Sequence, residues 1–325
     1  MNQKRSKWKN PLLLLLTATI WGVAFVAQSM GMDYVGPFTF NGVRSLLGAA
    51  VLLPVIYLFG GRKQHEGIDK DQRREQETVT EVACAKTEAA EVVTEASKEN
   101  QKTLWIGGLL CGLCLCAAST MQQIGIQYTT AGKAGFLTAM YIILVPVFGL
   151  FLKKKCSCYV GISIILATVG LYLLSIKDGF QVSVGDIYVM ICAVIFALHI
   201  LVIDYFSPKC DGVKLSCIQF LVCGVICSAV AIVVEQPQIG DVLQAWLPIG
   251  YAGILSCGVA YTLQIIGQKG MDPTVASLIL SLESVISVLA GWVILKQALS
   301  VRELTGCVIM FGAIILAQLP GKEEK

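Results

Sequence analysis

Hydrophobic residues run in long blocks along this chain, and the charged residues lie between the blocks. A helix needs about 20 apolar residues to cross the roughly 30 Å hydrocarbon layer of a bilayer. The blocks therefore predict an all-α integral membrane protein. Eight stretches contain no Asp, Glu, Lys or Arg: 10–32, 103–132, 134–152, 156–176, 187–203, 215–234, 242–268 and 304–321. Breaks at charged residues, Pro and Gly predict ten transmembrane helices: 11–31, 37–59, 104–126, 133–152, 157–176, 183–204, 213–234, 246–268, 273–294 and 302–319.

The composition supports this fold class and excludes several others. Of the 325 residues, 55% are hydrophobic and 14% are charged, whereas a soluble domain carries about 25% charged residues. A soluble enzyme, a nucleic-acid-binding protein and a secreted disulfide scaffold are therefore excluded. An outer-membrane barrel is excluded too, because its strands alternate apolar and polar residues.

Positive charge is unevenly distributed between the connections of the predicted helices. If the N-terminus is cytoplasmic, 20 Lys and Arg residues lie inside and only Lys133, Lys177, Lys296 and Arg302 lie outside. Cytoplasmic loops of membrane proteins carry such an excess of Lys and Arg. The pattern predicts a multi-pass protein of the plasma (inner) membrane with both termini cytoplasmic.

One large polar insertion interrupts the apolar blocks at residues 60–103. It contains eight basic and ten acidic residues and is rich in Glu, Ala, Thr and Lys. Such a segment cannot bury an apolar core. We expect it to be disordered or to form a marginal, solvated helix.

The two halves of the chain resemble each other weakly but in a common order. Ala18-x-Ile20-Trp21 matches Ala193-x-Ile195-Phe196, and Gly170 matches Gly312. Five predicted helices per half make the second half enter the membrane from the opposite side, as in inverted-repeat transporters. The sequence thus predicts two five-helix repeats, residues 1–178 with the insertion and residues 179–325. A duplication retained only as scaffold is the alternative.

The 13 cysteines do not indicate a disulfide framework. The spacing Cys111-x-x-Cys114-x-Cys116 is compatible with a metal or redox motif, but no His or carboxylate lies nearby. Packing of small apolar side chains in a membrane helix explains it better. The sequence predicts no metal site, no catalytic residue and no cofactor.

The chain resembles the EamA-like family of the drug/metabolite transporter superfamily over nearly its whole length except the insertion. The residues that carry the resemblance are Trp21-Gly22-Val23-Ala24-Phe25, Phe40, Arg44, Leu282-Glu283-Ser284, Ala290-Gly291-Trp292-Val293-Ile294-Leu295-Lys296 and the segment Gly306 to Gly312. The resemblance implies a central cavity and export of small metabolites or amino acids by alternating access. It also implies that the first, third, fourth, sixth, eighth and ninth helices line the cavity, with the fifth and tenth outside.

Glu283 is the strongest candidate for a functional residue. It lies near the middle of its predicted helix, where insertion of a charged residue costs about 2.5–3.5 kcal/mol. This carboxylate could bind a proton or a substrate amine; the alternative is a structural hydrogen bond to another helix. The internal repeat places Tyr141 at the equivalent position, facing the same cavity.

Two further ionisable residues lie within predicted helices. His199 could relay protons, although a packed neutral imidazole bonded to a carbonyl explains it as well. Arg44, with Asn41 on the same helix face, could attract a carboxylate or phosphate. Snorkelling of Arg44 to the outer interface is the equally plausible alternative.

Two glutamine pairs with i, i+4 spacing end two helices on opposite sides of the membrane. Gln123 with Gln127 and Gln264 with Gln268 could form outer and inner gates, whereas ordinary contacts between helices are the simpler explanation. Trp21 could form a cavity wall or serve only in packing.

The leading functional interpretation is a secondary-active transporter that exports a small metabolite or amino acid. The sequence contains no phosphate-binding loop of the Walker type, so ATP is not expected to drive it. An intramembrane enzyme or a passive channel or receptor is the alternative. The expected partners are the small-molecule substrate, membrane lipid and a proton as coupling ion, with no nucleic acid; the sequence leaves a homodimer open.

Overall fold

The computed structural model describes residues 2–75, 85–129, 131–152, 158–175, 183–294 and 300–317, and every regular element in these ranges is a helix. This confirms the all-α prediction. Eight helical segments are long and apolar enough to cross a membrane: Lys9–Gly31, Pro37–Leu58, Gln101–Ile126, Ala131–Phe151, Val184–Phe206, Gly212–Val234, Trp246–Gln268 and Pro273–Ile294. They coincide with eight of the ten predicted transmembrane helices. At the fifth and tenth positions lie shorter helices.

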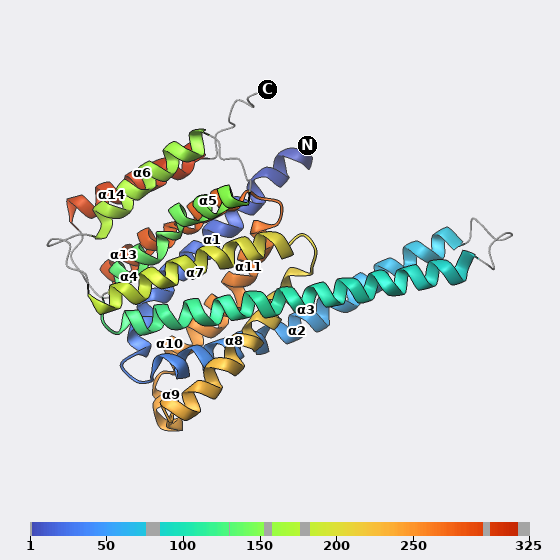
Figure 1. The fold of residues 1–325 in the computed structure, drawn as a ribbon, viewed down its shortest axis with the longest axis horizontal. Coiled ribbons are helices and arrows are strands. Elements are labelled where there is room, and N and C mark those ends of the chain that lie inside the picture. The colour runs from blue at the N-terminus through green and yellow to red at the C-terminus, as the bar shows by residue number, and fades with distance from the viewer. Residues whose placement is uncertain are drawn as a thin grey trace.

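The helices follow one another with short connections (Figure 1). The first half contains α1 (Asn2–Gly31), α2 (Pro37–Glu75), α3 (Ala85–Ile126), α4 (Ala131–Ala139), α5 (Tyr141–Phe151) and α6 (Cys158–Ser175). The second half contains α7 (Val184–Phe206), α8 (Gly212–Val234), α9 (Ile239–Gln244), α10 (Trp246–Gly250), the π-helix η1 (Tyr251–Tyr261), α11 (Thr262–Gln268), α12 (Pro273–Leu280), α13 (Leu282–Ile294) and α14 (Val301–Ala317).

The polar insertion is helical in its described parts. α2 continues to Glu75 and α3 starts at Ala85, so both transmembrane helices extend beyond the bundle as a helical pair (Figure 1). The described backbone of this segment agrees with the expectation of a helix and not with that of disorder, while its exposure to solvent stays a prediction. Residues 76–84 lie outside the described residues, as do Lys177 and Lys296 of the charge pattern.

Two transmembrane segments are interrupted near their middle. The fourth changes from α4 to α5 at Met140, and the ninth changes from α12 to α13 at Ser281. The eighth segment is irregular in another way, because α10 passes through η1 into α11. Interrupted helices at membrane depth occur where the backbone is buried in protein or lines a cavity.

α1 lies in the middle of the bundle and packs against α13, η1 and α11. Further close pairs are α3 with α7, α2 with α8, α3 with α8, and α2 with η1. α6 and α14 pack mainly against each other at the edge of the bundle (Figure 1). The placement of the fifth and tenth helices outside the centre is the one the family resemblance implies.

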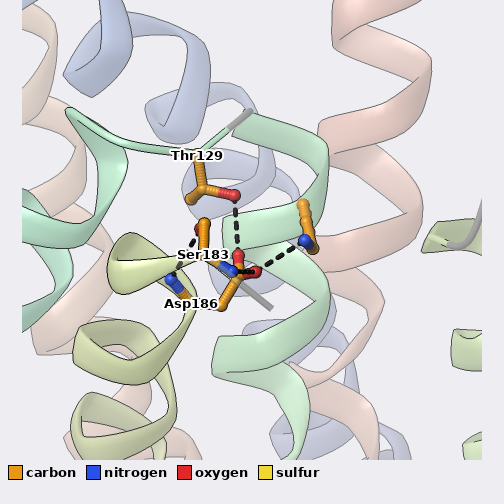
Figure 2. A network of polar contacts seen from close by, with 4 residues as sticks. Thr129, Ser183 and Asp186 are labelled. Atoms are coloured by element: carbon orange, nitrogen blue, oxygen red, sulfur yellow. Dashed lines mark hydrogen bonds and ion pairs between the residues drawn. The ribbon is translucent and has the colours of Figure 1, made fainter. Parts of the chain in front are cut away.

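Polar contacts connect the helices at one end of the bundle (Figure 2). The carboxylate of Asp186, in the first turn of α7, accepts hydrogen bonds from Lys133 Nζ at 2.6 Å and Thr129 Oγ1 at 2.9 Å. Ser183 and Asp186 also form a capping box at the start of α7. A capping box satisfies backbone N–H groups that the first helical turn leaves free. The network therefore fixes α7 relative to α4 and the end of α3.

Gly22 brings α1 unusually close to α13. A Cβ atom at this position would overlap Ile286 Cβ and lie 2.7 Å from the backbone oxygen of Glu283. Small residues allow this kind of backbone approach between membrane helices. Gly22 therefore sets the position of the α13 backbone beside Glu283.

We predict that Gly22→Ala destabilises the protein by about 1–3 kcal/mol, because the methyl group must displace the α13 backbone. Gly161→Ala is the control, since a Cβ there meets no atom within 4 Å. Thermal unfolding of both purified variants in detergent measures the difference. Equal midpoints for the two variants would contradict the close α1–α13 contact.

Candidate functional site

A cavity in the interior of the bundle is lined by residues from both halves of the chain. The first half contributes Trp21, Phe25, Gln28, Arg44, Gln122, Thr138 and Tyr141, and the second contributes Phe196, Ile200, Ser256, Tyr261, Gln264 and Glu283. These residues lie on the six helices that the resemblance implies as cavity-lining and, through Arg44, on the second helix. The space open to the centre of a water molecule is about 30 Å³, enough for about two waters.

Glu283 and Tyr141 meet across this cavity. The Tyr141 hydroxyl donates a hydrogen bond of 3.0 Å to Glu283 Oε1, and both side chains are buried. One residue comes from the first half and the other from the second. The expectation that they face the same cavity agrees with this contact, while a functional role for Glu283 stays a prediction.

The interruption before α13 positions Glu283. Ser281 ends α12, and its neighbours satisfy backbone oxygens with their own hydroxyls: Ser277 Oγ donates to Thr274 O at 2.8 Å and Ser284 Oγ donates to Ser281 O at 2.7 Å. Such side-chain bonds compete with the regular helical ladder and bend helices. Ser284, which stands next to Glu283, therefore belongs to the segment that orients the carboxylate.

Arg44 supplies a positive charge to the same cavity. Its side chain is only 5% exposed, and its guanidinium carbon lies 5.5 Å from the centre of the Phe40 ring. No carboxylate of the described residues forms an ion pair with it. This burial disfavours the snorkelling alternative. Asn41 is fully buried one turn earlier but does not line the cavity.

Several buried polar atoms at the cavity have no hydrogen-bond partner within the described part of the chain. They are Trp21 Nε1, Gln28 Oε1, Arg44 Nε and Gln264 Oε1. A buried polar group without a partner costs about 1–3 kcal/mol. A cavity that retains both donors and acceptors of this kind is suited to a polar ligand or to bound water.

Aromatic rings form the apolar wall of the cavity. The rings of Trp21 and Tyr261 lie 4.5 Å apart between centroids, at an angle of 56°. Phe25 and Phe196 add further apolar surface. Trp21 is therefore a wall residue as well as a packing residue.

His199 is fully buried behind this wall and does not line the cavity. Its Nε2 lies 3.1 Å from Gln219 Oε1, and its ring packs edge-on against Phe196 and Tyr261. The packed-imidazole alternative requires a neutral ring whose Nε2–H group donates to a carbonyl oxygen, and the Gln219 amide oxygen stands where it can accept. A proton-relay role has no further partner among the described residues.

The four glutamines expected at gates lie in different surroundings. Gln264 lines the cavity, while Gln268 and Gln123 are buried and donate to the backbone oxygens of Ile200 and Gln28 at 3.4 and 3.1 Å. Gln127 lies beyond the end of α3 and is exposed. The structure does not bring them together in two symmetric pairs.

Sequence reasoning did not single out Gln28, Gln122 and Thr138. Gln122 Nε2 donates to Thr138 Oγ1 at 3.1 Å, which connects α3 to α4 at the cavity. A signal for Gln28 does exist in the sequence, because it follows Trp21 and Phe25 at helical spacing and so shares their face. For the other two, only the packing of α3 against α4 reveals the contact.

The fold and cavity define a class: a multi-pass helical membrane protein with a cavity in its interior that polar side chains help to line. A model described as the "EamA-like transporter family" matches residues 8–71 and 183–319, more than half of the chain. The chain therefore belongs to the EamA-like transporter family, and its class is that of membrane transporters.

Known proteins agree with this assignment. An "Uncharacterized transporter" of Archaeoglobus fulgidus is 26% identical over 309 residues, which cover 94% of this chain and 84% of that protein. The "Uncharacterized transporter YoaV" of Bacillus subtilis is 20% identical, over 93% and 94% of the two chains. A solved structure titled "Crystal structure of protein" superimposes with a TM-score of 0.70 at 17% identity, covering 95% of this chain and 96% of the other, and supports the fold alone.

We predict that Tyr141→Phe destabilises the protein by about 1–3 kcal/mol, because it removes the hydroxyl that donates to the buried Glu283. Tyr128→Phe is the matched control, since Tyr128 is 61% exposed. Chemical or thermal unfolding in detergent compares the two. If both variants unfold like the wild type, the hydrogen bond contributes nothing measurable to stability.

Proposed function

We propose that this protein is a secondary-active transporter that exports a small amphipathic metabolite, in particular an amino acid, by alternating access. The observation that carries the proposal is the interior cavity, where an acidic residue, Glu283, and the cationic Arg44 lie on a wall built by both halves of the chain. Export is the direction that the family resemblance implies. The protein is not expected to be an enzyme.

The packing of the helices supports two inverted repeats of five helices. In an inverted repeat, each of the first five transmembrane segments corresponds to the segment five places later. Under this relation the contact of α3 with α7 corresponds to that of α1 with η1 and α11. The contact of α3 with α8 corresponds to that of α2 with η1. Both members of each pair are in contact. Two further contacting pairs, α2–α8 and α6–α14, each correspond to themselves under this relation. Such symmetry is typical of proteins that alternate between two states.

The two interrupted helices support the position of the binding site. The interruptions at Met140 and Ser281 stand at corresponding places of the fourth and ninth segments. Tyr141 follows the first by one residue and Glu283 follows the second by two. In transporters with inverted repeats, discontinuous helices near the midplane hold substrate or coupling ions. The site therefore lies at the interface of the repeats.

The chemistry of the cavity favours a substrate with both polar and apolar parts. Arg44 has donors for a carboxylate, Glu283 can accept from an amine or carry a proton, and the Trp21 and Tyr261 rings offer apolar contact. An amino acid with an apolar side chain has all three features. In the present cavity, the space that the centre of a water molecule can occupy is about 30 Å³. The bundle must therefore open for an amino acid to enter.

Orientation and cellular location complete the proposal. The excess of Lys and Arg in one set of connections supports a plasma-membrane protein with both termini in the cytoplasm, crossing ten times. A channel is the less favoured alternative, because the space that the centre of a water molecule can occupy in the cavity is only about 30 Å³ in this conformation. An intramembrane enzyme is less favoured because, among the described residues that line the cavity, no Ser, Thr or Cys is hydrogen-bonded to a His or a carboxylate.

We predict that Glu283→Gln inserts and folds normally but lowers proton-gradient-driven transport at least about tenfold, a loss of about 1.4 kcal/mol. The amide keeps the size and one acceptor but carries no proton. Proteoliposomes loaded with a uniformly labelled metabolite extract are given a proton gradient, and mass spectrometry follows the solutes that leave. Wild-type flux should vary between about pH 5.5 and 8.5, and the flux of the variant should not.

Asp241→Asn is the matched control, because Asp241 is an exposed carboxylate on α9. It should keep both the flux and the pH profile of the wild type. An unchanged flux and pH profile in Glu283→Gln would contradict a coupling or binding role for this carboxylate. A wild type that moves no solute at all would contradict the transporter proposal itself.

A further inference from the structure

Three cysteines from two helices gather inside the bundle, and none of them lines the cavity. Cys116 lies on α3, and Cys223 and Cys227 lie one turn apart on α8. Their sulfur atoms all lie within 4.8 Å of one another, and Cys116 Sγ is 3.5 Å from Cys227 Sγ. Cys223 and Cys227 are buried and Cys116 is half-buried. No sequence spacing connects them, since the two helices are separated by more than 80 residues.

The separation of the sulfur atoms suits a single metal ion. Thiolate sulfur lies about 2.3 Å from a bound ion such as zinc. Three sulfurs around one ion at that distance are about 3.8–4.0 Å apart. The observed spacing brackets this value, so small side-chain rotations suffice to bring all three sulfurs to one ion.

Hydroxyl groups surround the sulfur atoms. Ser45 Oγ lies 3.4 Å and Ser119 Oγ 3.9 Å from Cys223 Sγ, and Thr120 Oγ1 lies 3.7 Å from Cys227 Sγ. Donors of this kind stabilise coordinated thiolates from the second shell of a metal site. Arg44, the neighbour of Ser45, also acts on Cys223 electrostatically. These groups offset part of the negative charge that thiolates bring into the bundle.

We propose that Cys116, Cys223 and Cys227 form a binding site for Cu(I), which connects α3 to α8. Soft thiolate ligands select Cu(I) or zinc. Zinc in structural sites takes four protein ligands, and the group that the described residues form here has three members. Cu(I) carries one positive charge and is satisfied by thiolates alone, so three sulfurs complete its coordination.

Binding exchanges protons for the metal. Each thiol that coordinates loses its proton to solvent, so a site with three thiolates releases three protons for each Cu(I) bound. The copper stays in the +1 state and no electron is transferred. The fold brings the three sulfurs together, so the ion should bind the folded chain more tightly than the unfolded chain and raise the unfolding temperature of the protein.

The test uses the full chain in detergent, reduced and kept free of oxygen. Cu(I) is added, and bathocuproine disulfonate, a coloured chelator, competes for it. The wild type should retain one Cu(I) per chain, and X-ray absorption should find three sulfur neighbours. Cys116→Ser, Cys223→Ala and Cys227→Ala should each bind at least about 100-fold more weakly, beyond the range known for second-shell substitutions.

Cys307→Ala is the matched control, since Cys307 is a buried cysteine on α14, outside the cluster. It should keep the affinity of the wild type. Cys116 is the least buried of the three, so Cys116→Ser serves as the variant that retains the fold. A wild type that loses Cu(I) to the chelator, a copper affinity indifferent to all three substitutions, or selective retention of Zn²⁺ would each overturn the proposal.

Discussion

The constraint on which this structure depends is the cost of placing polar side chains among apolar helices. A charged residue in the middle of a transmembrane helix costs about 2.5–3.5 kcal/mol unless it faces protein or water. Glu283 and Arg44 both meet this condition by facing one interior cavity, which also receives Gln28 and Gln264. Helices from both halves must surround that cavity to exclude lipid. The arrangement of the bundle therefore follows from where its few polar groups can lie.

Local irregularities then shape the cavity. The breaks at Met140 and Ser281 and the π-helix at Tyr251–Tyr261 free backbone groups that a regular helix would pair. Serine hydroxyls take up some of them, as between Ser284 and the oxygen of Ser281. π-helical turns occur often at functional sites. Gly22 allows the backbones of α1 and α13 to approach each other closely beside Glu283.

Much of the fold could be predicted from hydrophobic patterning, because crossing a bilayer demands long apolar runs. The ends of the eight membrane-crossing segments agree with the expected ranges within a few residues. The meeting of Tyr141 with Glu283 agreed with the weak internal repeat. The break points and η1 could not be predicted, since a shift in hydrogen bonding leaves no compositional trace. Gln127 lies one residue beyond the end of α3 and is exposed, and its role at a gate stays a prediction. The cysteine cluster depends on packing between distant segments and has no sequence spacing.

The central claim is that solute passes through the interior cavity, and blocking that cavity tests it most directly. Ser256 lines the cavity, whereas the adjacent Leu255 is 39% exposed on the outer face of the same helix. Ser256→Trp and Leu255→Trp add a similar bulk at neighbouring positions. In proteoliposomes loaded with labelled metabolites, the account predicts that Ser256→Trp abolishes solute release while Leu255→Trp retains it. Equal release by the two folded variants would contradict the account.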